Sequence, residues 1–300
     1  MELNIGTDRP VTNVGTTLTP HTIQQPHDFF QAAATGCLGI VKQHLIRNAS
    51  IVQCVDSRGN NALILASTNG HNDVVELLLE YKTDIHSKNT NGWNSLMKAA
   101  SSGHITTVQL LLKHSANQFD VNTLGNNALM IAAIFGKIDI AEILLENNAD
   151  VKIKNKHGRT ALFLASLNGH MAVVDLLLKN NADINDTDIY KWNSLMAASS
   201  KGHTHVVSLL LSHNASTKEV NSEGLNAFLI AVANGRIETA NQLLKQPDAI
   251  TVTDAYGQNA LHIASYKGRI GILDLLINNK IDVNSKTKNG CDALMLAAAE

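Results

Sequence analysis

The chain has 300 residues, of which 44% are apolar, 4% aromatic and 17% charged, and its formal net charge is −2 with a pI near 6.7. This charge argues against a protein that coats phosphate backbones, because such proteins present a strongly basic face. The longest apolar stretch, residues 128–135, is far shorter than the ~20 residues of a membrane span, and no cationic-then-apolar segment opens the chain. We therefore expect neither a nucleic acid nor a membrane among the partners.

The three cysteines, Cys37, Cys54 and Cys291, are few and widely spaced. This pattern favours free thiols in a reducing compartment over a disulfide framework or a zinc site. The sequence therefore predicts a soluble, cytoplasmic protein without a metal ion or another cofactor.

The N-terminal 58 residues lack the regularity of the chain that follows. Residues 1–25 hold two of the four prolines and have no period, so they are predicted to form a disordered leader. Residues 26–58 follow the pattern of the later units one residue out of register and are predicted to form a degenerate N-terminal capping repeat. Phe29 and Phe30 are expected to cover the first apolar face.

Three phased series of residues divide residues 59–289 into seven units of 33 residues without an insertion. The first series is Gly59, Gly92, Gly125, Gly158, Lys191, Gly224, Gly257 and Gly290, in which the lysine replaces a glycine. The second series is Gly70, Gly103, Gly136, Gly169, Gly202, Gly235 and Gly268. The third series is Ala66, Ala99, Ala132, Ala165, Ala198, Ala231, Ala264 and Ala297.

Each unit is predicted to contain two short helices and a finger, the segment that leads from its second helix to the first helix of the next unit. The residue two after the first glycine is suited to cap a helix, because its side chain can accept from the free N–H groups of the first turn. These residues are Asn61, Asn94, Asn127, Thr160, Asn193, Asn226, Asn259 and Asp292. The first helix stops at the second glycine, and the second helix is expected to end at a left-handed residue such as Asn148, Asn181 or Asn214.

One such unit cannot bury its apolar face alone, so the units must stack into a solenoid. Period, glycines, alanines and leucine triplets resemble the ankyrin repeat, with its T-P-L-H-x-A signature, over about residues 26–300. Here the signature reads Asn-Ala-Leu-Ile, Asn-Ser-Leu-Met, Asn-Ala-Leu-Met or Thr-Ala-Leu-Phe. Only Thr160 and His262 keep the family identities, which puts the family's Thr–His hydrogen bonds in doubt. The resemblance implies an all-α solenoid of stacked helix-turn-helix units with hairpin-like fingers.

Residues 290–300 begin a further, truncated repeat that has one helix and no second helix against it. A solenoid is not expected to end on an open apolar face. We therefore interpret the 300 residues as part of a longer protein.

No pattern of catalytic residues stands out. The resemblance implies a structural hydrogen bond for the histidines that directly follow the second glycine, namely His71, His104, His170 and His203. His203 and His205 form a pair that lacks a third metal ligand, and no phosphate-binding or nucleophile motif occurs. A local basic finger, interpreted as solvated charge or alternatively as a patch for an acidic partner, is formed by Lys152, Lys154, Lys156 and Arg159.

In the ankyrin family, partners are met by finger tips and first-helix faces along the concave surface. The corresponding positions here are the two residues before the first glycine, the one after it, and the two before the second glycine. Six of the twelve aromatic residues fall at these positions, and exposed aromatics dominate binding hot spots. Ile189 shares them. The candidate contact residues are Trp93, Leu124, Ile134, Phe135, Arg159, Tyr190, Trp192, Leu225, Tyr256 and Tyr266.

An alternative is that some of these side chains pack against neighbouring fingers and stabilise the array. Neither tryptophan is assigned to the core. Lys191 is expected to adopt a backbone conformation that glycine takes freely. Because a lysine replaces the glycine of the other units beside Tyr190 and Trp192, we expect a functional site there.

The leading hypothesis is a non-catalytic protein–protein interaction scaffold, monomeric in isolation. The frequent Asn and the Asn-Ala-Leu-Met motif resemble ankyrin arrays that intracellular bacteria deliver into host cells. For a secreted effector, this resemblance implies a location in the host-cell cytosol. The alternative is a substrate-recruiting ankyrin module of a larger multidomain enzyme or effector that continues beyond residue 300. Nucleotide or RNA binding through the aromatics lacks a basic groove to support it.

Overall fold

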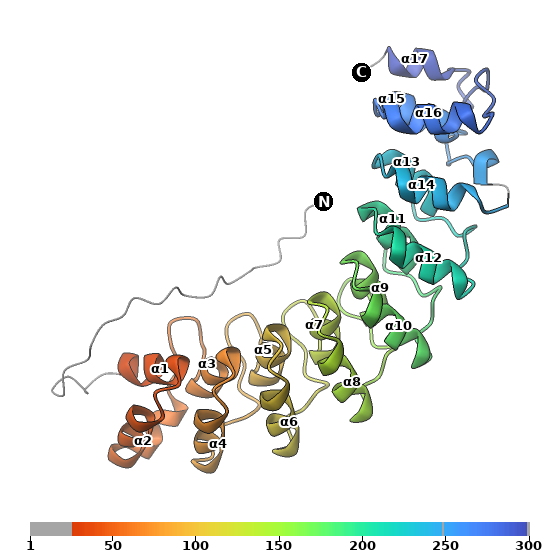
Figure 1. The fold of residues 1–300 in the computed structure, drawn as a ribbon. Coiled ribbons are helices and arrows are strands. Elements are labelled where there is room, and N and C mark those ends of the chain that lie inside the picture. The colour runs from red at the N-terminus through yellow and green to blue at the C-terminus, as the bar shows by residue number, and fades with distance from the viewer. Residues whose placement is uncertain (1–25, 248, 299–300) are drawn as a thin grey trace.

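The described part of the chain, residues 26–247 and 249–298 of a computed structural model, consists of seventeen α-helices and two 3-10 helices without a β-strand. The helices alternate between two layers of a curved array, and the odd-numbered, inner helices line its concave side (Figure 1). The all-α solenoid that the sequence predicts is thereby confirmed. The expected disordered leader, residues 1–25, lies outside the described residues.

The two layers are defined by the following bounds. The inner helices are α1 (Pro26–Thr35), α3 (Ala62–Asn69), α5 (Ser95–Ser102), α7 (Ala128–Ile134), α9 (Ala161–Leu167), α11 (Ser194–Lys201), α13 (Ala227–Ala233), α15 (Ala260–Tyr266) and α17 (Ala293–Ala297). The outer helices are α2 (Leu38–Arg47), α4 (Asn72–Glu80), α6 (Ile105–Lys113), α8 (Ile138–Glu146), α10 (Met171–Lys179), α12 (Thr204–Ser212), α14 (Ile237–Leu244) and α16 (Ile270–Asn278). The 3-10 helices are η1 (Ala49–Gln53) and η2 (Ala249–Thr251).

Every inner helix from α3 onward begins at the N-cap residue that the sequence predicts. In α3, for example, Oδ1 of Asn61 accepts a hydrogen bond of 2.8 Å from the backbone N–H of Ile64. Thr160 performs the same function with its hydroxyl, which accepts from Phe163 N at 3.2 Å. These bonds satisfy N–H groups that the helix itself leaves without a partner.

The signature histidine of the family acts once, at the start of α15. His262 Nδ1 accepts from the backbone N–H of Asn259 at 3.1 Å, while the Asn259 side chain accepts from His262 N. The other ring nitrogen lies 3.0 Å from the carbonyl oxygen of Ser285 in the next finger. The hydrogen-bond network that the sequence put in doubt is therefore present here with asparagine in place of threonine.

The turn between the helices of one unit is fixed by the residue that follows the second glycine. His104 Nε2 lies 3.0 Å from the carbonyl oxygen of Thr68, near the end of the preceding inner helix. A Cβ atom at Gly70 would lie 2.6 Å from Nδ1 of this ring, so the glycine makes room for it. Arg236 takes the same position two units after His170 and donates from Nε to Ser200 O at 3.1 Å. The structural role expected for these histidines is confirmed.

Left-handed residues end the outer helices, as expected for Asn148, Asn181 and Asn214, whose φ values are 65°, 61° and 61°. Three corresponding positions that carry other residue types are also left-handed, Lys82, Ser115 and Lys280, whereas the position held by Pro247 is not. The position, more than the asparagine, therefore determines this conformation.

The core is continuous from the first unit to the last, because each inner helix packs against the inner helices before and after it. Seven alanines of the third series are fully buried at these contacts: Ala66, Ala99, Ala132, Ala165, Ala198, Ala231 and Ala264. Phe29 and Phe30 of α1 are buried as well, and α1 packs on α3. Small side chains let the inner layer pack closely, which produces the curvature visible in Figure 1.

The fingers are turns rather than sheets. In the described residues, antiparallel pairing is limited to two isolated bridges, Thr187 with Asn193 and Thr253 with Asn259. Within the described residues, no helix combines the length and the apolar character that crossing a bilayer requires.

Candidate interaction surface

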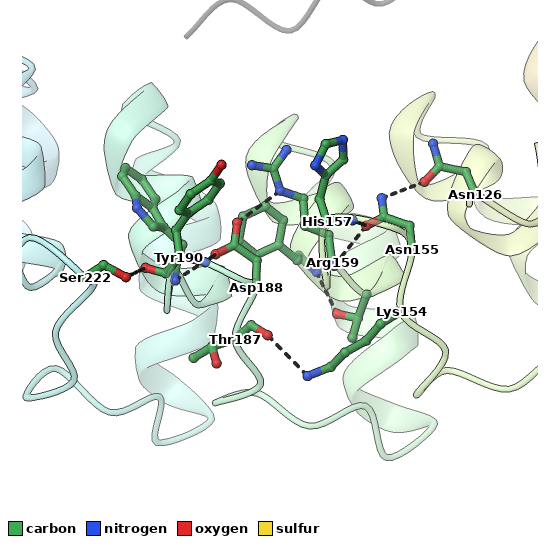
Figure 2. Close-up of polar contacts among 12 residues, drawn as sticks. Asn126, Lys154, Asn155, His157, Arg159, Thr187, Asp188, Tyr190 and Ser222 are labelled. Atoms are coloured by element: carbon green, nitrogen blue, oxygen red, sulfur yellow. Dashed lines mark hydrogen bonds and ion pairs between the residues drawn. The ribbon is translucent and has the colours of Figure 1, made fainter. Parts of the chain in front are cut away.

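The finger tips form a hydrogen-bonded row along the solenoid. Each tip is closed by a side chain that accepts from its own turn; Oδ1 of Asp188, for example, accepts from the backbone N–H groups of Tyr190 and Trp192 at 2.8 and 3.0 Å. Neighbouring tips are joined by backbone bonds, such as Ser222 N to Tyr190 O at 3.0 Å (Figure 2). The row of finger tips is therefore held in place by hydrogen bonds within the protein itself.

Side chains add a second set of bonds between tips. Asn155 donates from Nδ2 to Oδ1 of Asn126 at 2.7 Å, and both residues are buried. The same finger bonds to the following one, where Nε of Arg159 donates to Oδ2 of Asp188 at 3.2 Å, and this carboxylate is almost completely buried. Figure 2 shows these contacts following one another along the row.

Lys191 adopts the left-handed conformation that the sequence predicts, with φ of 60°. Its neighbours differ in exposure: Tyr190 is 47% exposed, whereas Trp192 is half-buried and packs against the core. Ile189, two residues before the lysine, is 59% exposed. This finger therefore presents an aliphatic and an aromatic side chain on a fixed backbone.

The ten candidate contact residues divide into two groups. The exposed ones are Leu124, Phe135, Tyr190, Tyr256 and Tyr266. The half-buried ones are Trp93, Ile134, Arg159, Trp192 and Leu225. The expectation that neither tryptophan belongs to the core is wrong in part, because each indole packs against buried apolar side chains while its remaining surface stays exposed.

Sequence reasoning missed two lysines that lie over aromatic rings. Lys98 Nζ is 4.9 Å from the ring centroid of Trp93, and Lys267 Nζ is 4.9 Å from that of Tyr266. Each lysine is close in sequence to its ring, and its position on an inner helix or just after one was the available signal. Such cation–π contacts hold an ammonium group at a defined place on the surface.

The basic finger expected from the sequence does not form one cluster. Lys154 pairs with Asp186 at 2.6 Å and donates to Thr187 O, and it points to the opposite side of the row from His157 and Tyr190 (Figure 2). Arg159 is paired with Asp188. Lys156 and His157 remain exposed at the tip.

The His203–His205 pair has separate environments. His203 Nε2 lies 3.1 Å from Leu167 O, and burial of the ring lowers its pKa below the usual value, an effect to which the charges of His170, Arg236 and Lys201 add. His205 is exposed on α12. Among residues 26–247 and 249–298, no three His, Cys, Asp or Glu side chains lie close enough together to bind a metal ion.

Two surface cavities, with volumes of about 180 and 210 Å³, contain none of the ten candidate residues. They are smaller than the ~300–1,000 Å³ of ordinary small-molecule sites. The candidate residues instead lie on an extended surface.

A family model described as ankyrin repeats (3 copies) matches residues 29–123, 117–188, 186–254 and 228–300. Together with the two-layered helical array and its fingers, this match shows that the chain belongs to the ankyrin-repeat family. Ankyrin repeats are in general protein–protein interaction modules and are typically non-catalytic. None of the curated proteins compared with the chain matched it.

Proposed function

We propose that this protein is a non-catalytic scaffold that binds a partner protein on its contact surface, the finger tips and the exposed flanks of the inner helices. The observation that carries the proposal is the 188–193 finger. There Ile189 and Tyr190 are exposed beside a lysine in a left-handed conformation, on a backbone held by hydrogen bonds to Asp188 and Ser222.

Rigid presentation of apolar side chains favours binding because little conformational entropy is lost on association. Tyrosine is enriched at interface hot spots, where its ring is buried and its hydroxyl finds a polar partner. Leu124 and Phe135 extend this apolar character toward the preceding units, and Tyr256 and Tyr266 extend it toward the following ones.

The half-buried candidate residues are proposed to support the contact surface rather than to form its centre. Trp93, Ile134, Trp192 and Leu225 pack against the core and are only partly exposed. Arg159 is engaged with Asp188 and lies 5.1 Å from the centroid of the Phe163 ring. We assign these five residues to the support of the surface, with contact to the partner through their remaining exposed atoms.

The proposal includes a cytoplasmic location and a monomeric state in isolation. Cys37, Cys54 and Cys291 are all unpaired, which favours a reducing compartment. Residues 26–58 are proposed to cap the array, since Phe29 and Phe30 are buried there, and residues 59–289 to form seven repeats. Residues 290–300 are proposed to begin a further repeat.

Quantitative capture from a lysate of the source cells tests the proposal. The full chain, a Tyr190→Ser variant and a Met171→Ser variant are used in parallel as bait. Met171 is a matched control because it is 49% exposed but lies at the start of the outer helix α10. We expect at least one protein to be retained by the wild type and by Met171→Ser and to be lost with Tyr190→Ser.

Captured proteins that depend on Met171 and not on Tyr190 would place the interaction on the outer layer and contradict the proposal. Circular dichroism of both variants checks that each remains folded.

A further inference from the structure

Charge is distributed unevenly between the two helical layers. The inner helices from α3 to α15 carry two lysines, Lys98 and Lys201, and no carboxylate. The outer helices from α4 to α16 carry two lysines, Lys113 and Lys179, and nine carboxylates. These carboxylates are Asp73, Glu76, Glu80, Asp139, Glu142, Glu146, Asp175, Glu238 and Asp274. Although the net charge of the whole chain is only −2, the outer helices from α4 to α16 are acidic and the inner helices from α3 to α15 are basic.

The finger tips beside α9 and α11 continue the basic character. Lys156, His157 and Lys191 are exposed at the tips of the 155–160 and 188–193 fingers. The carboxylate in these two tips, Asp188, is 6% exposed and already accepts from two backbone N–H groups and from Arg159. It is therefore not offered to a partner, and the exposed charge of the two tips is positive.

Apolar side chains lie between these cations. Leu124 precedes Lys156 by one finger, and Ile189 and Tyr190 precede Lys191 directly. On the inner helices, Lys98 is held over the Trp93 ring. We call this set, Lys98, Leu124, Lys156, Ile189, Tyr190, Lys191 and Lys201, the basic contact surface.

We infer that the basic contact surface binds an acidic segment of a partner protein in which carboxylates alternate with apolar side chains. The inference rests on the proposed function and adds the chemistry of the partner. Complementary charge steers association and fixes register, while the exposed Ile189 and Tyr190 take up the apolar side chains of the segment.

A polypeptide fits this surface better than a nucleic acid does. Leu124 and Ile189 are aliphatic and have no face on which a base can stack, whereas single-strand binding depends on aromatic stacking in a continuous basic groove. The lysines are also divided between two finger tips and two inner helices, and the acidic outer layer opposes a polyanion.

Fluorescence anisotropy with the full chain tests the inference. The probe is a fluorescein-labelled peptide of repeated Glu-Glu-Leu-Tyr. A length of about 16 residues is suitable, because an extended chain covers about 3.3 Å per residue and helices pack about 10 Å apart, so that it spans about five repeats. A Lys-Lys-Leu-Tyr peptide and an oligo-dT strand of the same length serve as comparison probes.

Two double variants change the charge equally, one on the finger tips and the other on the outer helices. Lys156→Glu with Lys191→Glu reverses two cations of the basic contact surface, and Lys113→Glu with Lys179→Glu reverses two exposed cations of α6 and α10. We expect the first pair to weaken binding of the acidic peptide about tenfold or more and the second pair to change it less than about twofold. Binding should also weaken as salt is raised, since the Debye length falls from about 10 Å at 0.1 M to about 3 Å at 1 M.

The other outcomes each overturn the inference in a recognisable way. Tighter binding of the lysine peptide, or no binding of the acidic peptide by the wild type, would show that the partner segment is not acidic. The proposed function would not be affected by this result, because the lysate experiment tests it separately. Tighter binding of oligo-dT would indicate a nucleic-acid site. Equal losses of affinity for the acidic peptide in the two double variants would show that the peptide does not bind at the finger tips. That result would contradict both the inference and the proposed function.

Discussion

At residue 191 a lysine takes the conformation that glycine takes at the seven corresponding positions, where φ lies between 74° and 81°. A side chain in this region crowds its own carbonyl group and costs roughly 1–2 kcal/mol. This unfavourable conformational energy falls in the finger that also exposes Ile189 and Tyr190. Strain beside exposed apolar residues is a reason to place the centre of the contact surface here.

Replacing this lysine with glycine should make the protein more stable. Lys191→Gly removes the left-handed strain but adds freedom to the unfolded chain, so we expect a gain of about 0.5–1 kcal/mol in the free energy of unfolding. Urea denaturation measures the change. The matched control is Gly158→Ala, where φ is 75° and the new Cβ would lie 3.0 Å from Ile189 N; it should lose about 1–2 kcal/mol. A clear loss of stability in Lys191→Gly would show that the lysine side chain stabilises the finger.

His203 should make stability dependent on pH. Burial lowers its pKa in the folded protein, so between its ordinary value of about 6.5 and the lowered value the unfolded chain binds the proton and the folded chain does not. Stability is therefore lost as the pH falls through this interval, and His44, whose pKa burial also lowers, acts in the same direction.

We expect Tm to fall between about pH 7.5 and pH 5, and to fall less in His203→Gln, whose amide can still donate to Leu167 O. Differential scanning calorimetry across this range provides the measurement, with the exposed His205→Gln as the control. A His203→Gln curve as steep as that of the wild type would assign the pH dependence to other groups.

Among the elements, the turn between inner and outer helix depends on one side chain that reaches back to the preceding unit. Histidine and arginine both serve, as His104 and Arg236 show with bonds of 3.0 and 3.1 Å to a helical carbonyl. Their shared property is a donor at the end of a side chain that packs over a glycine. Helix C-termini leave such carbonyl groups without partners, and each needs a donor.

His104→Ala should lower the free energy of unfolding by about 1–2 kcal/mol, because it removes the bond to Thr68 O and the packing over Gly70. His104→Arg should change it by less than about 0.5 kcal/mol, since arginine occupies this position in two later units. Urea denaturation compares the two variants. Equal losses would mean that the ring, rather than its donor, is required.

The helices could be predicted from the sequence because their boundaries depend on local chemistry. The caps Asn61 and Thr160, the glycine turns and the left-handed Asn148 each act within a few residues of their place in the chain. Contacts between fingers could not be predicted in this way, since residues 29 apart meet in them. Arg159 is predicted at a partner interface, and nothing in the sequence indicates that it also bonds to Asp188.

The degree to which side chains at the contact surface are buried could not be predicted from the sequence either. Trp93 and Trp192 occupy the positions of exposed residues, yet each indole reaches back onto the core. A Trp192→Ala variant would therefore change packing and binding together, which makes Tyr190 the better probe of the surface.

Over the whole molecule, protection from exchange should follow the packing of each unit against its neighbours. All seven residues of α9 are buried, whereas none of α17 is, and Leu294 is 81% exposed. We expect backbone amides of residues 293–298 to exchange faster with deuterium than those of residues 161–167, as mass spectrometry of the 300-residue chain can show. Equal protection would mean that α17 is covered in solution, for example by self-association.

We propose the concave side of the solenoid, and the 188–193 finger in particular, as the binding site for a partner protein. Titration calorimetry of the captured partner against Tyr190→Ala and Met171→Ala provides the measurement, since one side chain lies on a finger and the other on an outer helix, and they are exposed to 47% and 49%. We expect Tyr190→Ala to weaken binding by about 2 kcal/mol, roughly 30-fold, and Met171→Ala to change it by less than about twofold. Unchanged affinity in Tyr190→Ala together with a loss in Met171→Ala would instead place the binding site on the outer helices.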